Sequence, residues 1–339
     1  MNSICCIGNT PLIYLKKASE ISNCKIFGKA EFMNPGLSVK DRAALYILKD
    51  ALKNKKLNRG GTIVEGTAGN TGIGIALIAK ELGIKSVIVI PNTQSQEKKD
   101  ELKRLGAEII EVPAVPYSDP NNYIKYAKKI CEEIAKKDIN GAYWGNQFDN
   151  TINLQAHVET TAEEIIIQTN GEIDGFVCAS GTGGTIAGVS IGLKKYNKDI
   201  KVAVCDPMGS ALFSHFKNGK LEMTGSSISE GIGTSRITGN YKNAIIDDAF
   251  QIQDQTALDI IFDLIKDEGL CLGSSSGINI AGAIELGKKI GPNKIIVTIL
   301  CDVGRRYASK LFNPVFLKSK NLKFPNWLSN FRCDSELPS

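Results

Sequence analysis

Short apolar runs rich in β-branched residues alternate along the chain with longer segments of helical periodicity. Several of these runs lead directly into a glycine-rich turn and then into a helical pattern. The expected units are strand, turn and helix at 60–83; strand, turn, helix and strand at 86–112; strand, turn and helix at 175–196; a strand at 201–207; helix, turn and helix at 258–291; and a last buried strand at 294–302. Strands that alternate with helices predict parallel sheets with helices on both faces.

The same unit occurs in both halves of the chain, which predicts an α/β protein of two domains, each a mostly parallel sheet flanked by helices. We place the N-terminal domain at 1–150 and the C-terminal domain at 151–313, with residues of about 12–35 as a segment that can cross into the C-terminal sheet. The tail, 314–339, shows few periodic signals, so we expect a strap across the surface with disordered last residues. Glycine-rich turns after strands predict ligands at the carboxyl edges of the sheets.

Composition narrows the class of protein. Apolar residues make up 42% and charged residues 23% of the 339 residues, the balance of a soluble globular protein. The net charge of +5 is spread along the chain, and aromatic residues are not interleaved with basic ones, which argues against a nucleic-acid partner. Nine cysteines without a C-x-x-C spacing indicate reduced thiols in the cytoplasm, and the presence of only two histidines argues against a zinc site. Because no signal pattern or apolar run of membrane-spanning length is visible, no membrane contact is expected.

The turn SGTGGTIAG (180–188) is the strongest local signal. It follows an apolar strand and opens a helix, where free backbone amides can point at an anion and glycines keep side chains out of its path. The spacing fails as a dinucleotide fingerprint because Ile186 stands at the third glycine position, and no Gly-Lys-Ser/Thr ending makes it a P-loop. A single phosphate fits better, and a glycine turn without a ligand is the alternative. The residues expected to hold the phosphate are Gly181, Thr182, Gly183, Gly184 and Thr185.

Two further glycine-rich turns also open helices. In GTAGNTGIG, the hydroxyl and amide groups of Thr67, Asn70 and Thr71 suit a carboxylate, although an ordinary helix start explains the same letters. The turn GSSSG matches a hydrolase nucleophile motif, but no histidine follows Ser275 in the chain, which excludes that reaction. The Ser275 hydroxyl suits a ring atom of a ligand, or it simply caps the following helix.

Lys40 stands where the turn NPGLSVK becomes a helix. The N-terminus of a helix carries partial positive charge, so the neutral, nucleophilic amine is favoured there, and burial between two domains would act in the same direction. Such an amine can form a Schiff base, with Asp41 and Arg42 as a pair that supports the helix start. A surface lysine behind a Ser38 cap is the plainer explanation. Amine, phosphate, carboxylate and ring sites together describe an amino acid joined to pyridoxal phosphate.

The order of the motifs resembles that of the fold-type-II pyridoxal-phosphate enzymes, whose fold is that of the tryptophan synthase β-subunit, and among them the cysteine synthases (O-acetylserine sulfhydrylases). The motifs span residues 5 to 313 and are specific mainly in combination. They are IGNTPLIYL (7–15), NPGLSVKDRAA (34–44), EGTAGNTGIG (65–74), GNQFDN (145–150), SGTGGTIAGV (180–189), EGIGTSRITGN (230–240), GSSSG (273–277) and CDVGRRYASKLFN (301–313).

The resemblance implies a role for each matching position. Lys40 would carry the cofactor covalently and act as the catalytic base, Asn70 would bond the ring hydroxyl, and Ser275 would face the pyridine nitrogen. The phosphate would lie on the turn 181–185. The substrate carboxylate would lie among Thr67, Ala68, Asn70, Thr71 and Gln147, with the loop Gly231-Ile232-Gly233 over the substrate and cofactor.

The implied reaction is a β-replacement that makes L-cysteine from O-acetyl-L-serine and sulfide through an α-aminoacrylate intermediate. A cystathionine β-synthase-type reaction of serine with homocysteine is the closest alternative. O-Phosphoserine as the substrate, cysteine desulfhydration and a catalytically silent homologue that binds a partner also remain open. The resemblance further implies a homodimer and makes serine acetyltransferase a candidate partner.

Four positions bear on which branch of the family the chain resembles. Ala68 stands where family members often have serine, which removes one hydroxyl from the carboxylate site. Asp302 and Arg305 differ from the best-known bacterial enzymes and resemble a sub-branch with a CD-x-G ending. Arg236 would favour a phosphate leaving group if it pointed into the site, but a solvated loop residue is the plainer expectation.

Overall fold

The N-terminal half of the chain builds a four-stranded parallel sheet covered by helices. The structure, a computed structural model, describes residues 3–67 and 69–329. The strand order of this sheet is β5-β4-β3-β6. Its elements are α2 (Lys40–Lys53), β3 (Thr62–Gly66), α3 (Asn70–Leu82), β4 (Lys85–Pro91), α4 (Gln96–Arg104), β5 (Glu108–Val112), α5 (Tyr123–Ala135) and β6 (Ala142–Trp144).

Apolar side chains alternate between the two faces of this sheet. Ile63, Ile88 and Ile90 pack with α2 and α3 on one face. Val64 and Val87 pack with α5 on the other face. The alternation follows from the two-residue period of a strand. Because both faces are buried, the strands appear in the sequence as continuous apolar runs.

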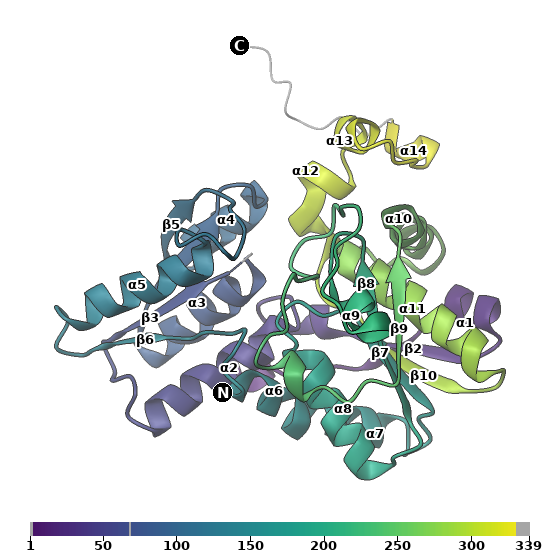
Figure 1. The fold of residues 1–339 in the computed structure, drawn as a ribbon, viewed down its shortest axis with the longest axis horizontal. Coiled ribbons are helices and arrows are strands. Elements are labelled where there is room, and N and C mark those ends of the chain that lie inside the picture. Colours follow the sequence, from purple (N-terminus) through teal and green to yellow (C-terminus); the bar gives the residue numbers. More distant parts are fainter. Residues whose placement is uncertain (1–2, 68, 330–339) are drawn as a thin grey trace.

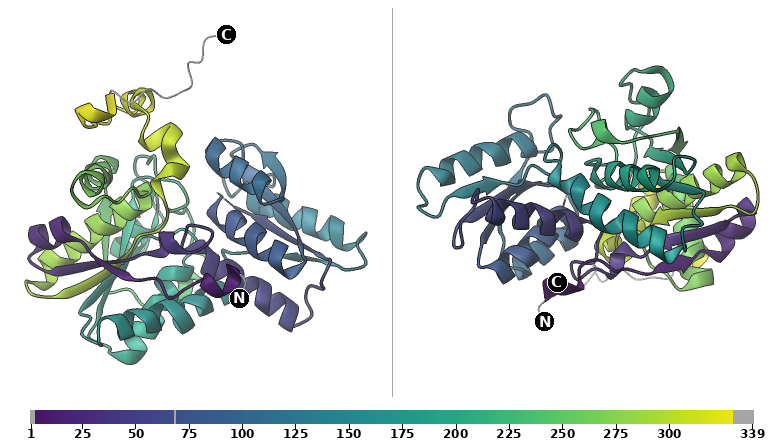
Figure 2. Two further views of the ribbon diagram at one scale, coloured as in Figure 1. Left: turned by 180° about the vertical axis from the view of Figure 1, so that it is seen from behind. Right: turned by 90° about the horizontal axis from the view of Figure 1, so that it is seen from below.

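The larger sheet has six strands in the order β1-β2-β10-β7-β8-β9, and only β1 runs antiparallel. Its strands are β1 (Leu12–Tyr14), β2 (Lys25–Lys29), β7 (Gly175–Cys178), β8 (Lys201–Pro207), β9 (Asp248–Ile252) and β10 (Ile295–Ile299). Strand β2 comes from the N-terminus and pairs with β10, so the purple N-terminal segment lies within the half of the molecule that is otherwise green and yellow (Figure 2).

Helices cover both faces of the larger sheet. One face carries α1 (Lys16–Ser22), α10 (Asp254–Asp263) and α11 (Ser274–Ile290). The other carries α7 (Glu163–Gln168), α8 (Gly184–Tyr196) and α9 (Leu212–Asn218). Helix α6 (Ile152–Ala156) contacts both α2 and α8 and so joins the two halves. No helix in the described part of the chain is both long and apolar enough to cross a membrane.

The expected α/β fold class, with parallel sheets flanked by helices, is confirmed. Strands and helices form at 60–83, 86–112 and 175–196 in the expected order. Four strands were not among the expected elements: β6, β9, and also β1 and β2, which lie in the segment of about 12–35 that was expected to cross into the C-terminal sheet. The division of the chain at residue 150 stays a prediction.

The tail from Pro314 forms two short helices, α13 (Pro314–Ser319) and α14 (Asn326–Ser329), where few periodic signals were visible in the sequence, and α12 (Ala308–Leu311) precedes it. The last residues, which were expected to be disordered, lie outside the described residues. The Asn313 side chain accepts hydrogen bonds from the N–H groups of Val315 and Phe316, and Pro314 stands in the first turn, both favourable features of a helix start. Leu317 and Leu328 pack with α10 in one apolar cluster.

A buried ion cluster ties the start of α2 to distant segments. Arg42 donates to Glu31 from Nε and Nη2, at 2.7 Å each, and to Glu164 on α7 at 2.6 and 2.8 Å. Lys29 Nζ lies 2.6 Å from Glu164 Oε2. The Asp41 carboxylate instead accepts a hydrogen bond from the Gly36 backbone. Asp41 and Arg42 therefore hold the helix start through separate partners rather than as a pair.

Candidate active site

A cleft lies at the carboxyl ends of β3, β7 and β10. These strands come from both halves of the molecule, which lie side by side in Figure 1. The volume of the cleft is about 200 Å³. An adjoining hollow shares Lys40 with the cleft and extends along Gly183 and Thr185.

Gly184 lines neither the cleft nor the adjoining hollow and packs against Asn153. Ala68 lies outside the described residues. Of the residues singled out in the sequence, the cleft brings together Lys40, Thr67, Asn70, Thr71, Gln147, Gly181, Thr182, Gly231 and Ser275.

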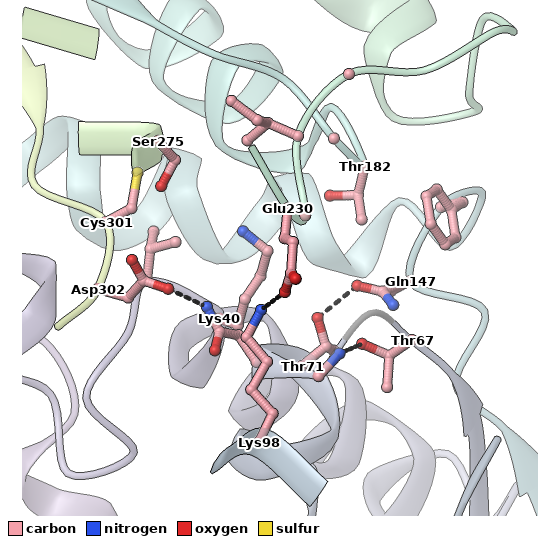
Figure 3. A pocket seen from close by; sticks show the side chains of 18 of the residues that line it. Lys40, Thr67, Thr71, Lys98, Gln147, Thr182, Glu230, Ser275, Cys301 and Asp302 are labelled. Atoms are coloured by element: carbon pink, nitrogen blue, oxygen red, sulfur yellow. Dashed lines mark hydrogen bonds and ion pairs between the residues drawn. The ribbon is translucent and has the colours of Figure 1, made fainter. Parts of the chain in front are cut away.

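Lys40 is the first residue of α2, and its side chain extends into the cleft toward Ser275 and Thr182 (Figure 3). Its backbone N–H donates to Ser38 Oγ at 3.3 Å. The Lys40 amine has no hydrogen-bond or ion-pair partner among the described residues. An unpaired amine at a helix N-terminus that faces a cleft is available as a nucleophile and as a base.

The turn between β7 and α8 presents unpaired donors to the adjoining hollow. In the part of the chain that the structure describes, the N–H groups of Gly181, Thr182 and Gly183 donate to no acceptor. The buried Ser180 hydroxyl also lacks a partner there. Buried donors without an acceptor are costly unless a ligand accepts from them. Their position at the start of α8 suits a phosphate.

A buried histidine that the sequence did not mark positions the Thr185 hydroxyl. His157 Nε2 lies 3.2 Å from Thr185 Oγ1, and its Nδ1 lies 2.9 Å from Thr161 Oγ1. Burial lowers the pKa of His157 well below its usual value, and the charges of Arg42 and Lys40 act in the same direction, so the ring is neutral. A neutral ring can accept from Thr161 and donate to Thr185, which leaves the Thr185 proton free for the hollow.

Gly183→Ala is expected to lower the free energy of unfolding by about 1–3 kcal/mol. Gly183 has φ +87°, and a Cβ there would collide with the backbone of Tyr241. Gly219→Ala is the matched control, because Gly219 has φ +77° but open space around its Cα. Urea denaturation of both variants separates the collision from the backbone strain that they share. Equal losses of stability would contradict the close approach of Tyr241.

Hydroxyl and amide groups converge on the opposite side of the cleft, near the start of α3 (Figure 3). Thr71 Oγ1 donates to Gln147 Oε1 at 2.5 Å, and Gln147 Nε2 donates to the Gly66 carbonyl at 3.1 Å. Thr67 Oγ1 accepts from the Gly69 N–H at 3.1 Å. The Thr67 hydroxyl proton and the second N–H of Gln147 are therefore left as donors that suit a carboxylate.

A buried carboxyl group supports Gln147 from behind. Glu65 Oε2 accepts from the Gln147 backbone N–H at 3.3 Å, and Glu65 Oε1 has no partner within the described residues. Burial raises the pKa of Glu65 to about 8, although several backbone and side-chain hydrogen bonds act against this rise. At neutral pH the folded protein therefore holds Glu65 protonated.

Glu65→Gln is expected to flatten the pH dependence of stability below about pH 8. The folded state keeps the Glu65 proton up to about pH 8, whereas the ordinary value for the unfolded chain is 4.5. The stabilisation from this proton is complete below the unfolded pKa and is lost as the pH rises through the folded pKa, with a slope of about 1.4 kcal/mol per pH unit. Urea denaturation across this range measures the slope, and Glu20→Gln, an exposed position, should keep it. An unchanged slope in Glu65→Gln would contradict the buried proton.

The third side of the cleft joins the start of α3 to the start of α11. Asn70 Nδ2 contacts Asp302 Oδ2, and Ser275 lies beside Cys301 (Figure 3). The Cys301 backbone N–H donates to Ser276 Oγ at 2.9 Å, which ties the end of β10 to α11. Burial raises the pKa of Cys301 to about 11, so its thiol stays neutral. This side therefore places a neutral hydroxyl and a neutral thiol next to each other.

Sequence reasoning missed an ion pair in the cleft. Lys98 Nζ lies 2.6 Å from Glu230 Oε2 and 4.3 Å from the centre of the Tyr307 ring. Glu230 also pairs with Lys310. Lys98 belongs to the lysine-rich helix α4, where no local signal distinguishes a residue that faces the cleft from one that faces water. The pair connects α4 to the loop that begins at Gly231.

Arg236 lies outside the cleft and is not a solvated loop residue, so that expectation is wrong. Its two terminal nitrogens donate to the Asp149 carboxylate at 3.0 Å each. The guanidinium also lies 4.3 Å from the centre of the Tyr117 ring, and the side chain is only 21% exposed. A guanidinium held by a carboxylate and an aromatic ring is not a free site for an anionic leaving group.

Comparisons with known proteins agree with this geometry. Residues 6–302 match the family described as pyridoxal-phosphate dependent enzyme. The chain is 49% identical to Cysteine synthase 1 of Neurospora crassa over 321 residues, which cover 93% of this chain and 84% of that relative. The structure of an O-acetylserine dependent cystathionine beta-synthase from Helicobacter pylori aligns with a TM-score of 0.82 and 34% identity, over 91% of this chain and 97% of that one. A hydrogen sulfide-producing enzyme from Fusobacterium nucleatum aligns with a TM-score of 0.80 and 33% identity, over 90% and 99%.

The chain therefore belongs to the pyridoxal-phosphate dependent enzymes. Within that class it belongs with the cysteine synthases, and its cofactor is pyridoxal phosphate. The residues present fit this group. The unpaired Lys40 amine suits an aldehyde, the unpaired N–H groups after β7 suit a phosphate, and the Ser275 hydroxyl suits a ring nitrogen.

Proposed function

We propose that this protein makes L-cysteine by β-replacement, with O-acetyl-L-serine as the substrate and sulfide as the incoming nucleophile. The observation that carries the proposal is the convergence of three unpaired donor sets on one cleft. They are the Lys40 amine, the N–H groups of the turn 181–183, and the hydroxyl and amide donors of Thr67 and Gln147. Together they suit the aldehyde, the phosphate and the amino-acid carboxylate of pyridoxal phosphate joined to a substrate. The similarity to Cysteine synthase 1 supports the same product.

The placement of the side chains, and for Gly184 and Ala68 the resemblance to cysteine synthases alone, supports an assignment of roles. Lys40 holds the cofactor covalently and acts as the catalytic base, Ser275 bonds the ring nitrogen, and Asn70 bonds the ring oxygen. The phosphate is bound by Gly181, Thr182, Gly183, Gly184 and Thr185. The substrate is bound by Thr67, Ala68, Asn70, Thr71, Gln147 and Gly231.

Bound pyridoxal phosphate withdraws electrons from the Cα atom of an attached amino acid, which labilises both the Cα proton and the group on Cβ. The Lys40 amine takes the proton from Cα and later returns one to it. Thr67 and Gln147 hold the carboxylate, which fixes the direction of the Cα–H bond relative to Lys40. The loop Gly231-Ile232-Gly233 lines the cleft and would lie over the substrate and cofactor. The Gly233 N–H donates to the Ser180 carbonyl at 2.8 Å, which anchors this loop on the turn after β7.

Formation of cystathionine with homocysteine is the second candidate, and the similarity to the Helicobacter enzyme supports it. O-Phosphoserine has less support as a substrate. The cations that could recognise its phosphate are both engaged, Arg236 with Asp149 and Lys98 with Glu230. A second anion would have to displace a carboxylate from one of them.

The experiment uses the holoenzyme with O-acetylserine, O-phosphoserine and serine in separate reactions. The change in the visible absorbance of the cofactor identifies which compound is activated. Sulfide or homocysteine is then added, and cysteine or cystathionine is quantified. We expect kcat/KM for O-acetylserine with sulfide to exceed the other combinations by at least about tenfold. A preference for homocysteine, or no response to O-acetylserine, would overturn the proposal.

The proposal includes a homodimer in the cytoplasm that binds the C-terminal peptide of serine acetyltransferase in the cleft. The resemblance to cysteine synthases supports these assignments. Sedimentation velocity measures the oligomeric state. Competition between the peptide and O-acetylserine for the holoenzyme measures whether both use the cleft.

A further inference from the structure

One short segment of the larger half of the molecule holds both ends of the Asn70 side-chain amide. Asn70 Nδ2 donates to Asp302 Oδ2 at 2.6 Å, the bond drawn in Figure 3. Arg306 Nη1 donates to Asn70 Oδ1 at 3.0 Å. Both partners are buried, with 1% of Asp302 and 5% of Arg306 exposed. Both follow β10: Asp302 precedes the 3-10 helix Gly304–Tyr307, and Arg306 lies within that helix.

These two bonds determine what Asn70 can offer to a ligand. A carboxylate only accepts hydrogen bonds and a guanidinium only donates them. If the Asn70 amide rotated by half a turn, its oxygen would face Asp302 and its N–H groups would face Arg306, so both bonds would become repulsive. Asp302 uses one N–H of the amide. The second N–H remains, so the nitrogen end of the Asn70 amide can present a donor to the cleft that Asn70 lines.

Further contacts fix Asp302 and Arg306 themselves. The Tyr307 hydroxyl donates to Asp302 Oδ2 at 2.5 Å, and burial raises the pKa of Tyr307 well above its usual value, so the phenol remains a donor. A Cβ on Gly273 would collide with Asp302 Oδ1, so only glycine leaves room for the carboxylate. Arg306 Nη2 donates to the Gly36 carbonyl at 2.6 Å, in the turn that precedes Lys40. The same guanidinium thus contacts the amide of Asn70 and the turn before Lys40.

We propose that Asp302 and Arg306 are positioning residues that lock the Asn70 amide with its N–H toward the ring oxygen of the cofactor. This inference rests on the proposed contact between Asn70 and that ring oxygen. An N–H donor stabilises the anionic form of an oxygen, whereas an amide carbonyl in its place would stabilise the protonated hydroxyl. We call Asp302 and Arg306, together with the two bonds that they make to Asn70, the clamp. By fixing the orientation of the Asn70 amide, the clamp selects the protonation form of the bound cofactor.

The test uses full-length holoenzyme with Asp302→Asn, which removes the charge and changes the shape little. We expect the visible absorbance to shift between the two protonation forms of the bound cofactor, with a change of about 10- to 100-fold in their ratio. Arg306→Met should shift the absorbance in the same direction. Arg305→Ala is the matched control, because Arg305 is the exposed residue next to Arg306. This variant should have the same spectrum as the unmodified enzyme at every pH. A spectrum of Asp302→Asn that matches the unmodified enzyme across the pH range would overturn the proposal.

A double-mutant cycle separates an effect through Asn70 from a general loosening of the site. In an Asn70→Ala background, Asp302→Asn should change the ratio of protonation forms by less than about twofold, because the group that it positions is absent. Equal effects in the two backgrounds would overturn the clamp. If the unmodified enzyme binds the cofactor but does not convert O-acetylserine, the proposed function fails, while the spectra still decide whether the clamp exists.

Discussion

Lys40→Ala is expected to remove covalent attachment of the cofactor and to lower turnover by at least about 10³-fold. Lys40 lines both the cleft and the adjoining hollow, and its amine has no partner among the described residues. Its removal therefore breaks no hydrogen bond or ion pair there, and the loss should fall on chemistry rather than on folding. Lys98 also lines the cleft, but Glu230 holds its amine and it cannot take over as the base.

Reduction of the holoenzyme with borohydride followed by intact mass spectrometry measures the attachment, and kcat measures the chemistry. Lys53→Ala is the control, because Lys53 is exposed at the other end of the same helix. The thermal unfolding of both variants should match that of the unmodified protein. Turnover of Lys40→Ala within tenfold of the control would refute the catalytic role of Lys40.

Glu31→Ala is expected to lower the free energy of unfolding by about 3–5 kcal/mol. Glu31 is fully buried and accepts hydrogen bonds from Arg42 and from the Thr10 hydroxyl, the latter at 2.7 Å. Without it, the Arg42 guanidinium would remain buried with Glu164 as its single carboxylate partner. An incompletely paired buried charge costs far more than the loss of an exposed ion pair.

Urea denaturation near neutral pH measures this loss, and Glu20→Ala on the surface should change stability by less than about 0.5 kcal/mol. The Glu164 carboxylate of this cluster is ionised there. Although burial alone would raise the pKa of Glu164, Arg42 and Lys29 lower it to about 2 from an ordinary value of 4.5. The contribution of ionised Glu164 to stability is present above its ordinary pKa of 4.5 and is lost as the pH falls toward 2. If Glu31→Ala and Glu20→Ala had the same urea midpoint, the ion cluster would contribute little to the free energy of unfolding.

Local patterns were sufficient to predict the elements that carry the site. The turns after β3 and β7 depend on glycines that are adjacent in the chain, and the strands before them are apolar because both of their faces are covered. The carboxyl ends of parallel strands meet at one edge. Thr67 and Thr182 therefore reach the same cleft, as expected from the motifs alone.

Pairings between distant segments could not be predicted from local patterns. Lys98 and Glu230 are 132 residues apart, and Arg236 and Asp149 are 87 residues apart. The local sequence around a charged residue on a helix or loop does not show whether its side chain faces water or a buried partner. The three-residue strand β6 was missed for a related reason, since its pairing with β3 defines it and its own residues do not.

Tyr307 belongs both to the packing of the tail and to the cleft. Its ring lies in the apolar cluster with Leu317 and Leu328, and its hydroxyl bonds Asp302. A protease cut or a purification tag that detaches α13 and α14 would therefore disturb the cofactor environment from the far end of the chain. The integrity of these last helices is a practical quality criterion for any preparation used in kinetics.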